Sequence, residues 1–188
     1  MMKLLLCASL IFSLSCLSVP TAIAQDYFPL EKGSETTFQY TDMFSQNGLS
    51  SMVMRVGEDE KTVKGQSYLE LITEMSSSGN IGFSNSSFVR MTDEGLVGLP
   101  TAASQKEELM MPSEFEVGKS WSTSQGKVEI LQTDGTISTP SGSYDDCLVL
   151  ETSMAGGGTL SYYQEGIGLV AMGMNQGGKF ALMAYRSE

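Results

Sequence analysis

The thioether groups of methionine have the most distinctive chemistry in this sequence. Met52-x-Met54 and Met172-x-Met174 each place two sulfur atoms on one face of an extended strand, because successive side chains of a strand point to opposite sides. Thioethers are soft ligands that select Cu(I), so the two pairs raise the hypothesis of a copper site. Methionine is also a flexible filler of apolar cores, and the sequence has no histidine to complete a copper site. We therefore expect these methionines to pack in a core.

Acidic side chains are the second group that could do chemistry. Glu58-Asp59-Glu60 and Asp145-Asp146 could offer oxygens to Ca²⁺, but neither run has the spaced Asp, Asn and Gly residues of an EF-hand loop. We interpret both runs as exposed acidic turns. Two carboxylates could also cleave a glycosidic bond, although no pair stands out among the 22 acidic residues. A carboxylate-dependent enzyme, such as a glycan hydrolase, is therefore the alternative function.

Histidine and cysteine narrow the chemistry further. Because the sequence has no histidine, it cannot use Ser-His-Asp or Cys-His catalysis or hold zinc through imidazole. Cys147 opens the apolar run Cys147-Leu148-Val149-Leu150, which favours a buried and unreactive thiol. We predict that the protein is not an enzyme, with no catalytic residue, no metal ligand and no cofactor.

The N-terminus has the order of a secretory signal peptide. Met1-Met2-Lys3 is basic, the next 14 residues are apolar apart from serine and cysteine, and Ala22-Ile23-Ala24 offers the small side chains that signal peptidase requires. An apolar run of this length is shorter than the ~20 residues of a membrane-spanning helix. The sequence therefore predicts a signal peptide over 1–24 and a single exported domain over 25–188, with no transmembrane segment after processing.

Acylation of Cys16, with anchoring as a lipoprotein, is the alternative for the N-terminus. A lipoprotein signal normally carries leucine three residues before the cysteine, and this sequence has Ser13 there. Cleavage after Ala24 fits the sequence better, and the signal is of bacterial type. We therefore expect a periplasmic or secreted protein.

Charge limits the partners of the exported domain. Residues 25–188 contain ten basic and 22 acidic residues, since Lys3 is the one charged residue of the predicted signal peptide, and their net charge is −12. Such a surface repels nucleic acid, which is not expected as a partner. An apolar ligand or a protein of the cell envelope is expected instead, and the sequence does not predict an oligomeric state.

Short apolar and β-branched runs, separated by Gly, Asn, Asp and Ser, predict an all-β fold. We expect a strongly curved antiparallel meander of about ten strands, as an open barrel or a sandwich. Asn47-Gly48, Asp93-Glu94-Gly95 and Asp134-Gly135 are among the predicted turns. One short helical segment is predicted near Ala102–Met111, which lies between two prolines. The expected strands lie near Ser34–Asp42, Leu49–Gly57, Gln66–Met75, Gly82–Thr92, Gly95–Pro100, Ser120–Gln132, Gly142–Thr152, Gly158–Glu165, Gly168–Asn175 and Lys179–Arg186.

The domain has a weak internal repeat. Leu30-Glu31-Lys32-Gly33 is echoed by Phe115-Glu116-Val117-Gly118, and Gly65-Gln66-Ser67-Tyr68 is echoed by Gly142-Ser143-Tyr144. These echoes predict two similar β-units, 25–100 and 112–188, that share one core.

Four motifs of aromatic residues and glycine are spread over nearly the whole domain. Together and in this order they resemble a broad group of bacterial exported proteins of unknown function, which open with "YFPL…G…W.Y" and close with "YYAPGVGLV". Thr36 stands where that group usually has Trp, and Gln164-Glu165 replaces Ala-Pro. The resemblance implies an exported location and an all-β fold, and it supplies no catalytic residue. The motifs are Tyr27-Phe28-Pro29-Leu30-x-x-Gly33, Val117-Gly118-Lys119-Ser120-Trp121, Ser141-Gly142-Ser143-Tyr144-Asp145-Asp146-Cys147-Leu148-Val149 and Tyr162-Tyr163-x-x-Gly166-Ile167-Gly168-Leu169-Val170.

These observations predict an exported, non-enzymatic envelope or secreted protein that binds an apolar ligand or an envelope protein. If the ligand is apolar, the inward faces of several strands should line a concave cavity. The residues expected to line it are Met52, Met54, Phe83, Phe88, Met91, Met172 and Met174.

Overall fold

The computed structural model describes residues 24–41, 49–77, 80–104, 106–154, 157–176 and 179–187. These residues form twelve strands and one helical turn, α1 (Ala24–Tyr27), which confirms the predicted all-β fold. The first six strands are β1 (Glu35–Tyr40), β2 (Leu49–Val63), β3 (Gln66–Ser77), β4 (Asn80–Thr92), β5 (Gly95–Leu99) and β6 (Glu108–Pro112). The second six are β7 (Ser120–Thr123), β8 (Gly126–Thr139), β9 (Gly142–Met154), β10 (Gly157–Gln164), β11 (Gly168–Gln176) and β12 (Lys179–Arg186).

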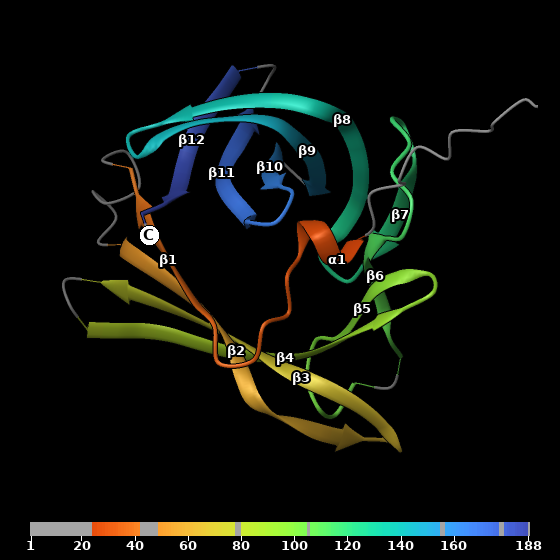
Figure 1. The fold of residues 1–188 in the computed structure, drawn as a ribbon. Helices are drawn as coiled ribbons and strands as arrows, with labels where there is room; N and C mark the ends of the chain where they lie inside the picture. Colours follow the sequence, from red (N-terminus) through yellow and green to blue (C-terminus); the bar gives the residue numbers. More distant parts are fainter. Residues whose placement is uncertain are drawn as a thin grey trace, which may run out of the picture.

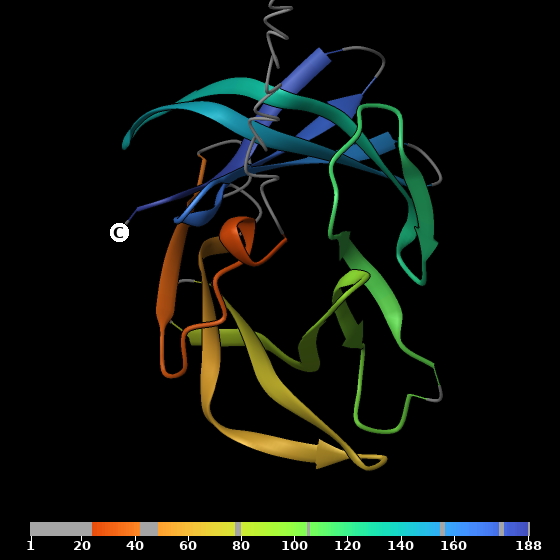
Figure 2. The same cartoon turned by 45° about the vertical axis from the view of Figure 1, so that its right-hand side comes forward.

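The twelve described strands form one antiparallel sheet that curves into a ring (Figure 1). Their order is β6-β5-β4-β3-β2-β1-β12-β11-β10-β9-β8-β7, so the pairing of β1 with β12 joins two meanders of six strands. The two ends of the sheet, β6 and β7, lie beside each other (Figure 2). The backbone N–H and the hydroxyl of Ser124 both donate to the Glu108 carboxylate at 2.9 Å across this seam. The sheet is therefore a nearly closed barrel, which is the first of the two predicted forms, an open barrel or a sandwich.

The N-terminal segment enters the barrel and fills part of its interior. We call residues 24–34 the plug; its helical turn α1 lies inside the ring of strands in both views (Figures 1 and 2). Ala24 and Tyr27 are only 1% and 7% exposed, and the Tyr27 ring packs edge-on against Phe115 at 5.0 Å. Gly166 anchors the plug, because its N–H donates to the Asp26 carbonyl at 2.7 Å.

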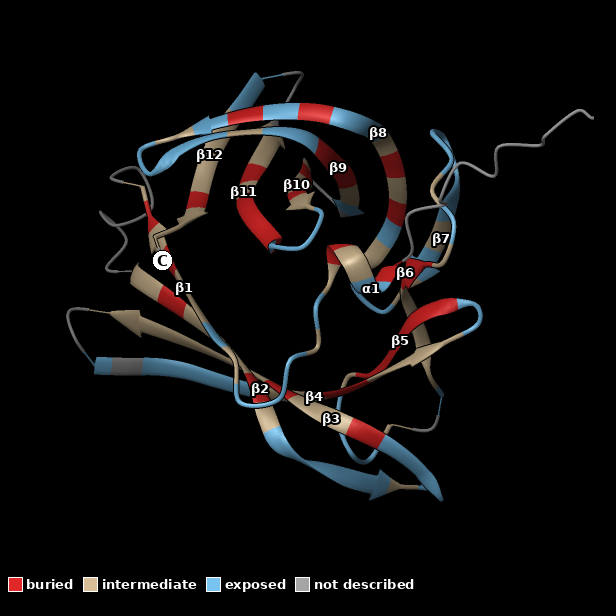
Figure 3. Ribbon diagram, in the orientation of Figure 1, coloured by how far each residue is buried: buried red, intermediate tan, exposed pale blue. Residues whose placement is uncertain are grey.

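The main core lies between the plug and the barrel wall. It forms because alternate side chains of each strand point inward, and Figure 3 shows buried residues on β5, β8 and β9 around the plug. Burial of a Leu, Val or Ile side chain contributes roughly 1.5–3 kcal/mol of transfer free energy, so this cluster is a large stabilising term. Its buried members are Ala24, Tyr27, Val56, Leu71, Val89, Leu96, Met111, Val128, Ile130, Leu148 and Leu150.

Strand β9 is buried on both faces. Leu148 and Leu150 face the main core, whereas Cys147 and Val149 belong to a second cluster with Ile137 of the long strand β8. The second cluster is possible because β8 and β9 are long, bulged strands that arch over β10–β12 (Figure 1).

A small apolar cluster also covers the outer face of β3–β5. Tyr68, Phe88 and Leu99 are buried there, on the faces of their strands opposite to the main core. The segment between β5 and β6 closes over them, because the Glu107 carboxylate accepts two hydrogen bonds from Arg90 (2.6 and 2.9 Å) and one from the Tyr68 hydroxyl (2.6 Å).

The predicted helical segment near Ala102–Met111 is wrong. Its last four residues are part of β6, in which Leu109 pairs with Val97 and Met111 pairs with Leu96 of β5. Helix propensity amounts to a few tenths of a kcal/mol per residue, and the burial of Met111 together with the ladder to β5 outweighs it. β6 therefore completes the first set of six strands, beyond the predicted boundary at residue 100.

Two further strand predictions need correction. The predicted strand Ser120–Gln132 is divided into β7 and β8 by a turn at residues 124–125. The predicted turn Asp134-Gly135 lies instead within β8, where Gly135 is buried at a bulge opposite Cys147. A Cβ at Gly135 would lie 2.4 Å from Val149 Cγ2, so this glycine permits a close approach of two strands. The described chain consequently has twelve strands, where about ten were expected.

The predicted signal peptide lies outside the described residues except for Ala24, and so does the alternative acylation site, Cys16. The predicted turn Asn47-Gly48 lies outside them as well.

Candidate functional site

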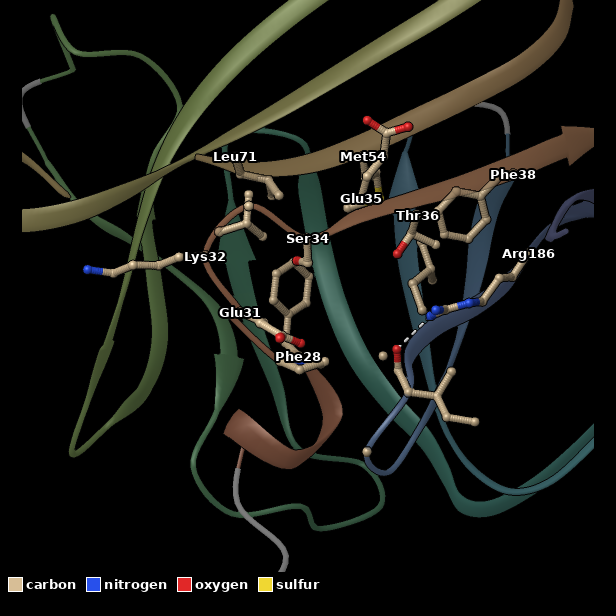
Figure 4. A pocket seen from close by; sticks show the side chains of 17 residues that line it. Phe28, Glu31, Lys32, Ser34, Glu35, Thr36, Phe38, Met54, Leu71 and Arg186 are labelled. Atoms are coloured by element: carbon tan, nitrogen blue, oxygen red, sulfur yellow. Dashed lines mark hydrogen bonds between the residues drawn. The ribbon is translucent and has the colours of Figure 1, made fainter. Parts of the chain in front are cut away.

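A cavity of about 510 Å³ lies between the plug and the barrel wall (Figure 4). Three groups of residues enclose it: segment 28–36, the inward side chains of β2 and β3, and the turn into β11 at residues 166–169, with Arg186 at the end of β12. The exposed plug residues Glu31, Lys32 and Gly33 form part of its mouth. We call this space the plug cavity.

The inner wall of the plug cavity is apolar. Thr36 and Phe38 of β1 both line it, since side chains two residues apart share a face of the strand. On β2, Met54, the partner of Thr36, and Val56 line it in the same way. Figure 4 shows Phe38 and Met54 on one side and Phe28 of the plug on the other. The apolar side chains in the wall are Phe28, Pro29, Phe38, Met54, Val56, Leu71, Ile167 and Leu169.

Two of the sequence motifs meet at this cavity. Gly168 follows the turn after β10 with a φ of +92°, and a Cβ built on it would lie 3.2 Å from the Cδ of Pro29. Phe28 packs against Tyr163 with 6.3 Å between the ring centroids. The Tyr27–Gly33 and Tyr162–Val170 motifs therefore hold the plug against the barrel end, and both contribute to the cavity wall.

The mouth of the cavity carries both signs of charge. Glu35 accepts a hydrogen bond from Arg55 at 2.9 Å, and Lys32 pairs with Glu60 at 2.8 Å. Arg186 Nη1 donates to the Ile167 carbonyl at 2.8 Å, a bond visible in Figure 4, and thereby ties β12 to the turn that closes the cavity. These groups place polar atoms at the mouth of a space with an apolar interior.

Tyr163 is the titratable group that packs behind the cavity. Burial raises the pKa of its phenol to about 12, against a smaller opposing effect of a hydrogen bond with Ser161. The phenol is therefore neutral at physiological pH, and its ring adds to the apolar support of Phe28.

The fold separates Met174 from the other three methionines of the copper hypothesis. Met52, Met54 and Met172 join one cluster of the barrel interior, together with Met75 and Met183. Met174 belongs to none of the clusters of buried residues in the described chain. The two predicted pairs therefore do not converge as a set of four sulfur atoms.

Most of the residues predicted to line an apolar cavity lie elsewhere. Phe83 is 53% exposed, Phe88 belongs to the outer cluster under the β5–β6 segment, and Met91 packs against the main core. Of the seven residues expected, Met54 lines the plug cavity. The prediction was wrong for Phe88 because Val89, its neighbour on β4, takes the inward position.

The acidic runs are exposed, as predicted. Glu58 and Asp59 point to solvent from β2, and Glu60 pairs with Lys32 and Ser67. Asp145 and Asp146 are exposed in β9. They lie in strands rather than turns. In the described ranges, no three Asp, Glu, Cys or His side chains come together in a way that could hold a metal ion.

Cys147 is fully buried, as predicted. Burial raises the pKa of its thiol to about 11, and the carboxylates of Asp145 and Asp146 act in the same direction. The thiol is consequently protonated at neutral pH.

Comparison with known proteins gives similarity of structure alone. No known protein family matches this chain, and no curated protein matches its sequence. A presumed exported protein with a YmcC-like fold from Bacteroides fragilis is 14% identical, with a TM-score of 0.48 over 86% of this chain and 97% of that one. A presumed lipoprotein from Parabacteroides distasonis is also 14% identical, with a TM-score of 0.41 over 85% of this chain and 95% of that one. Among the described residues, no helix has the length and apolar character needed to cross a membrane.

Proposed function

We propose that this chain is an exported, non-enzymatic binding protein that holds an apolar group in the plug cavity. The observation that carries the proposal is a preformed space of about 510 Å³ that is open to solvent, with apolar side chains at its base and polar groups over the rest of its lining. Cavities that bind small molecules measure about 300–1,000 Å³ and combine an apolar lining with a few polar groups that orient the ligand.

The way the cavity is built supports binding over a purely structural role. Tight packing normally removes such spaces, because a void lined by apolar side chains forfeits their dispersion contacts. Here Gly168 keeps the plug close to β11, and Leu71 packs in the main core with Tyr27 of the plug, so the space lies beside this packed contact. A ligand in this space would recover those contacts.

Export is proposed from the sequence, because Ala22-Ile23-Ala24 offers a cleavage site before Gln25. Cleavage there would remove Ala24, with its buried methyl group and the carbonyl that accepts from the Phe28 N–H, and leave the rest of the plug in the mature chain. The hydrogen bond from Gly166 to Asp26 would therefore be retained.

Solvent extraction tests the proposal directly. The protein is purified without detergent, extracted with organic solvent, and the extract is analysed by mass spectrometry beside an equal amount of an unrelated exported protein. We expect one lipid or other apolar compound to be enriched in the extract of this protein. An empty extract, together with no binding of a solvatochromic apolar dye, would overturn the proposal.

A matched pair of substitutions locates the binding site. Thr36→Trp places an indole in the plug cavity, because Thr36 lines it, whereas Thr37→Trp places the same group on the opposite face of β1. We expect Thr36→Trp to abolish dye binding and Thr37→Trp to retain it. Equal dye binding by both variants would show that the dye binds outside the plug cavity.

A further inference from the structure

We infer that the ligand of the plug cavity is an extended alkyl chain, and that its inner end lies among the methionines behind Met54. This inference rests on the proposed function and adds the shape of the ligand and its direction in the barrel.

The inner wall of the plug cavity is also the surface of the methionine cluster. Phe38, Met54 and Leu169 line the cavity, and the same three residues pack in the cluster that contains the other methionines. We define the methionine cluster as Met52, Met54, Met75, Met172 and Met183, which come from β2, β3, β11 and β12. Met54 belongs to both sets, whereas the other four thioethers do not line the cavity, so a chain reaches them only if side chains of the shared wall move.

Methionine side chains suit a wall that must change shape when a ligand enters. Its unbranched side chain has three rotatable bonds and changes shape at low cost, whereas branched Leu, Ile or Val side chains have few rotamers. Met52 is 4% exposed and its four partners in the cluster are partly buried, so a thin object entering from the cavity would meet movable side chains on several strands. A slender alkyl chain fits such a path better than a broad rigid ring system does.

The polar mouth sets the direction of the chain. Lys32, Glu35 and Arg186 lie at the opening, so the polar end of an amphiphile stays there and its apolar end points inward. Each additional methylene that reaches the methionine cluster should increase affinity by about fourfold, the equivalent of ~0.8 kcal/mol of transfer free energy. Affinity should therefore continue to rise with chain length.

Methionine oxidation maps where the chain ends. The protein is exposed briefly to dilute hydrogen peroxide, alone or with octanoate or hexadecanoate below its micellar concentration, and each sulfoxide is measured by peptide mass spectrometry. We expect octanoate to protect Met54, and hexadecanoate to protect both Met54 and Met172. Met174 is the control, since it lies on the same strand outside the methionine cluster, and neither probe should protect it.

A second matched pair of variants measures the same path by affinity. Met172→Phe puts a stiff ring in the methionine cluster, and Met174→Phe makes the same change two residues away. Affinities are measured by displacement of a bound dye. Met172→Phe should lower the affinity for hexadecanoate by about tenfold or more. It should change the affinity for octanoate by less than about twofold, because a short chain does not reach the cluster. Met174→Phe should change neither probe.

The outcomes separate this inference from the proposed function. Failure of both fatty acids to bind would overturn this inference, and an empty solvent extract with no dye binding would overturn the proposed function as well. Binding of octanoate and hexadecanoate with equal affinity, or protection of Met54 without Met172, would leave the cavity as the ligand site and overturn the inference that the chain reaches the methionine cluster. Oxidation mapping of the wild-type protein decides the question even if Met172→Phe does not fold.

Discussion

Gly33 and Gly118 occupy the same place in the two sets of six strands. The N–H of Gly33 donates to Val56 at 3.1 Å, and Val56 donates back to Ser34; the N–H of Gly118 donates to Ile130 at 2.8 Å, and Ile130 donates back to Lys119. Both glycines have positive φ, 76° and 88°. Gly33 attaches the segment before β1 to Val56 of β2, and Gly118 attaches the segment before β7 to Ile130 of β8. Both partners belong to the main core. This shared pattern supports the predicted duplication, which stays a prediction about how the chain arose.

This equivalence predicts that both glycines stabilise the fold for the same reason, their positive φ. Gly33→Ala and Gly118→Ala should each lower the free energy of unfolding by about 1–2 kcal/mol, because alanine is strained at positive φ. Open space surrounds a Cβ at Gly118, and Gly33 would meet ordinary contacts at 3.6 Å, so the cost is conformational. Urea denaturation measures both values. Gly82→Ala in β4 is the control, because Gly82 has no positive φ and no contact closer than 3.9 Å, and it should be neutral.

The strands were predictable where alternation and turn chemistry agree. In β1, Phe38 and Tyr40 alternate with polar residues, and the turn at 93–94 ends in Gly95 with a φ of 126°, as the sequence suggested. β6 was missed because Glu107 to Met111 are good helix formers, and their pairing with β5 depends on residues brought together by the fold. Local propensity carries no information about such a partner.

The plug cavity could not be predicted in the same way. Its wall combines Phe28 and Pro29 with Gly168 and Leu169, which lie near opposite ends of the chain. Both motifs are visible in the sequence, but nothing in their residues shows that they meet. Predicting that the two motifs meet requires the pairing of β1 with β12, and no local sequence pattern contains that information.

The stability that Glu107 contributes by holding the segment between β5 and β6 should depend on pH. The Arg90 guanidinium lowers the pKa of the Glu107 carboxyl below its usual value, and a hydrogen bond from Tyr68 acts in the same direction. A carboxyl whose pKa is lower in the folded state stabilises the fold above its unfolded pKa, and this stability is lost as the pH falls through the folded pKa. Glu107→Gln should therefore lower the free energy of unfolding by about 1–2 kcal/mol at pH 7, and by less as the pH approaches 3.

Denaturant titrations at pH 7 and pH 3 check this expectation, with Glu116→Gln as the exposed control that should behave like the wild type. A loss that is equal at both pH values would show that Glu107 acts through packing and that its charge contributes nothing.

Cys147 should resist modification in the native protein. Its thiol is buried and its pKa is raised to about 11, so almost no thiolate is present at neutral pH. A thiol reagent at pH 7 should react only after denaturant is added. Cys147→Ser should cost about 1–2 kcal/mol because it buries a hydroxyl in an apolar cluster, and Cys147→Ala should cost less than Cys147→Ser if polarity is the cause. Rapid labelling without denaturant would contradict the expected burial.

Copper should not bind tightly. Met52, Met54 and Met172 lie in an apolar cluster, and Met174 lies outside it, so the four predicted sulfur atoms offer no common coordination centre. An anaerobic titration with Cu(I) against a competing chelator should therefore show no stoichiometric site. A tight site that disappears in Met172→Leu but persists in Met174→Leu would instead assign copper to the methionine cluster.

The mature chain should begin at Gln25. Signal peptidase requires small side chains at the positions of Ala22 and Ala24, so Ala24→Leu should block processing and leave a longer protein in the membrane fraction. Cys16→Ser should leave processing and location unchanged, because cleavage at Ala24 does not involve the thiol. N-terminal sequencing and fractionation of the expressing cells measure both effects. The reverse result, with Cys16→Ser abolishing processing and the wild-type chain beginning at an acylated Cys16, would make the protein a lipoprotein whose tether leads into the plug.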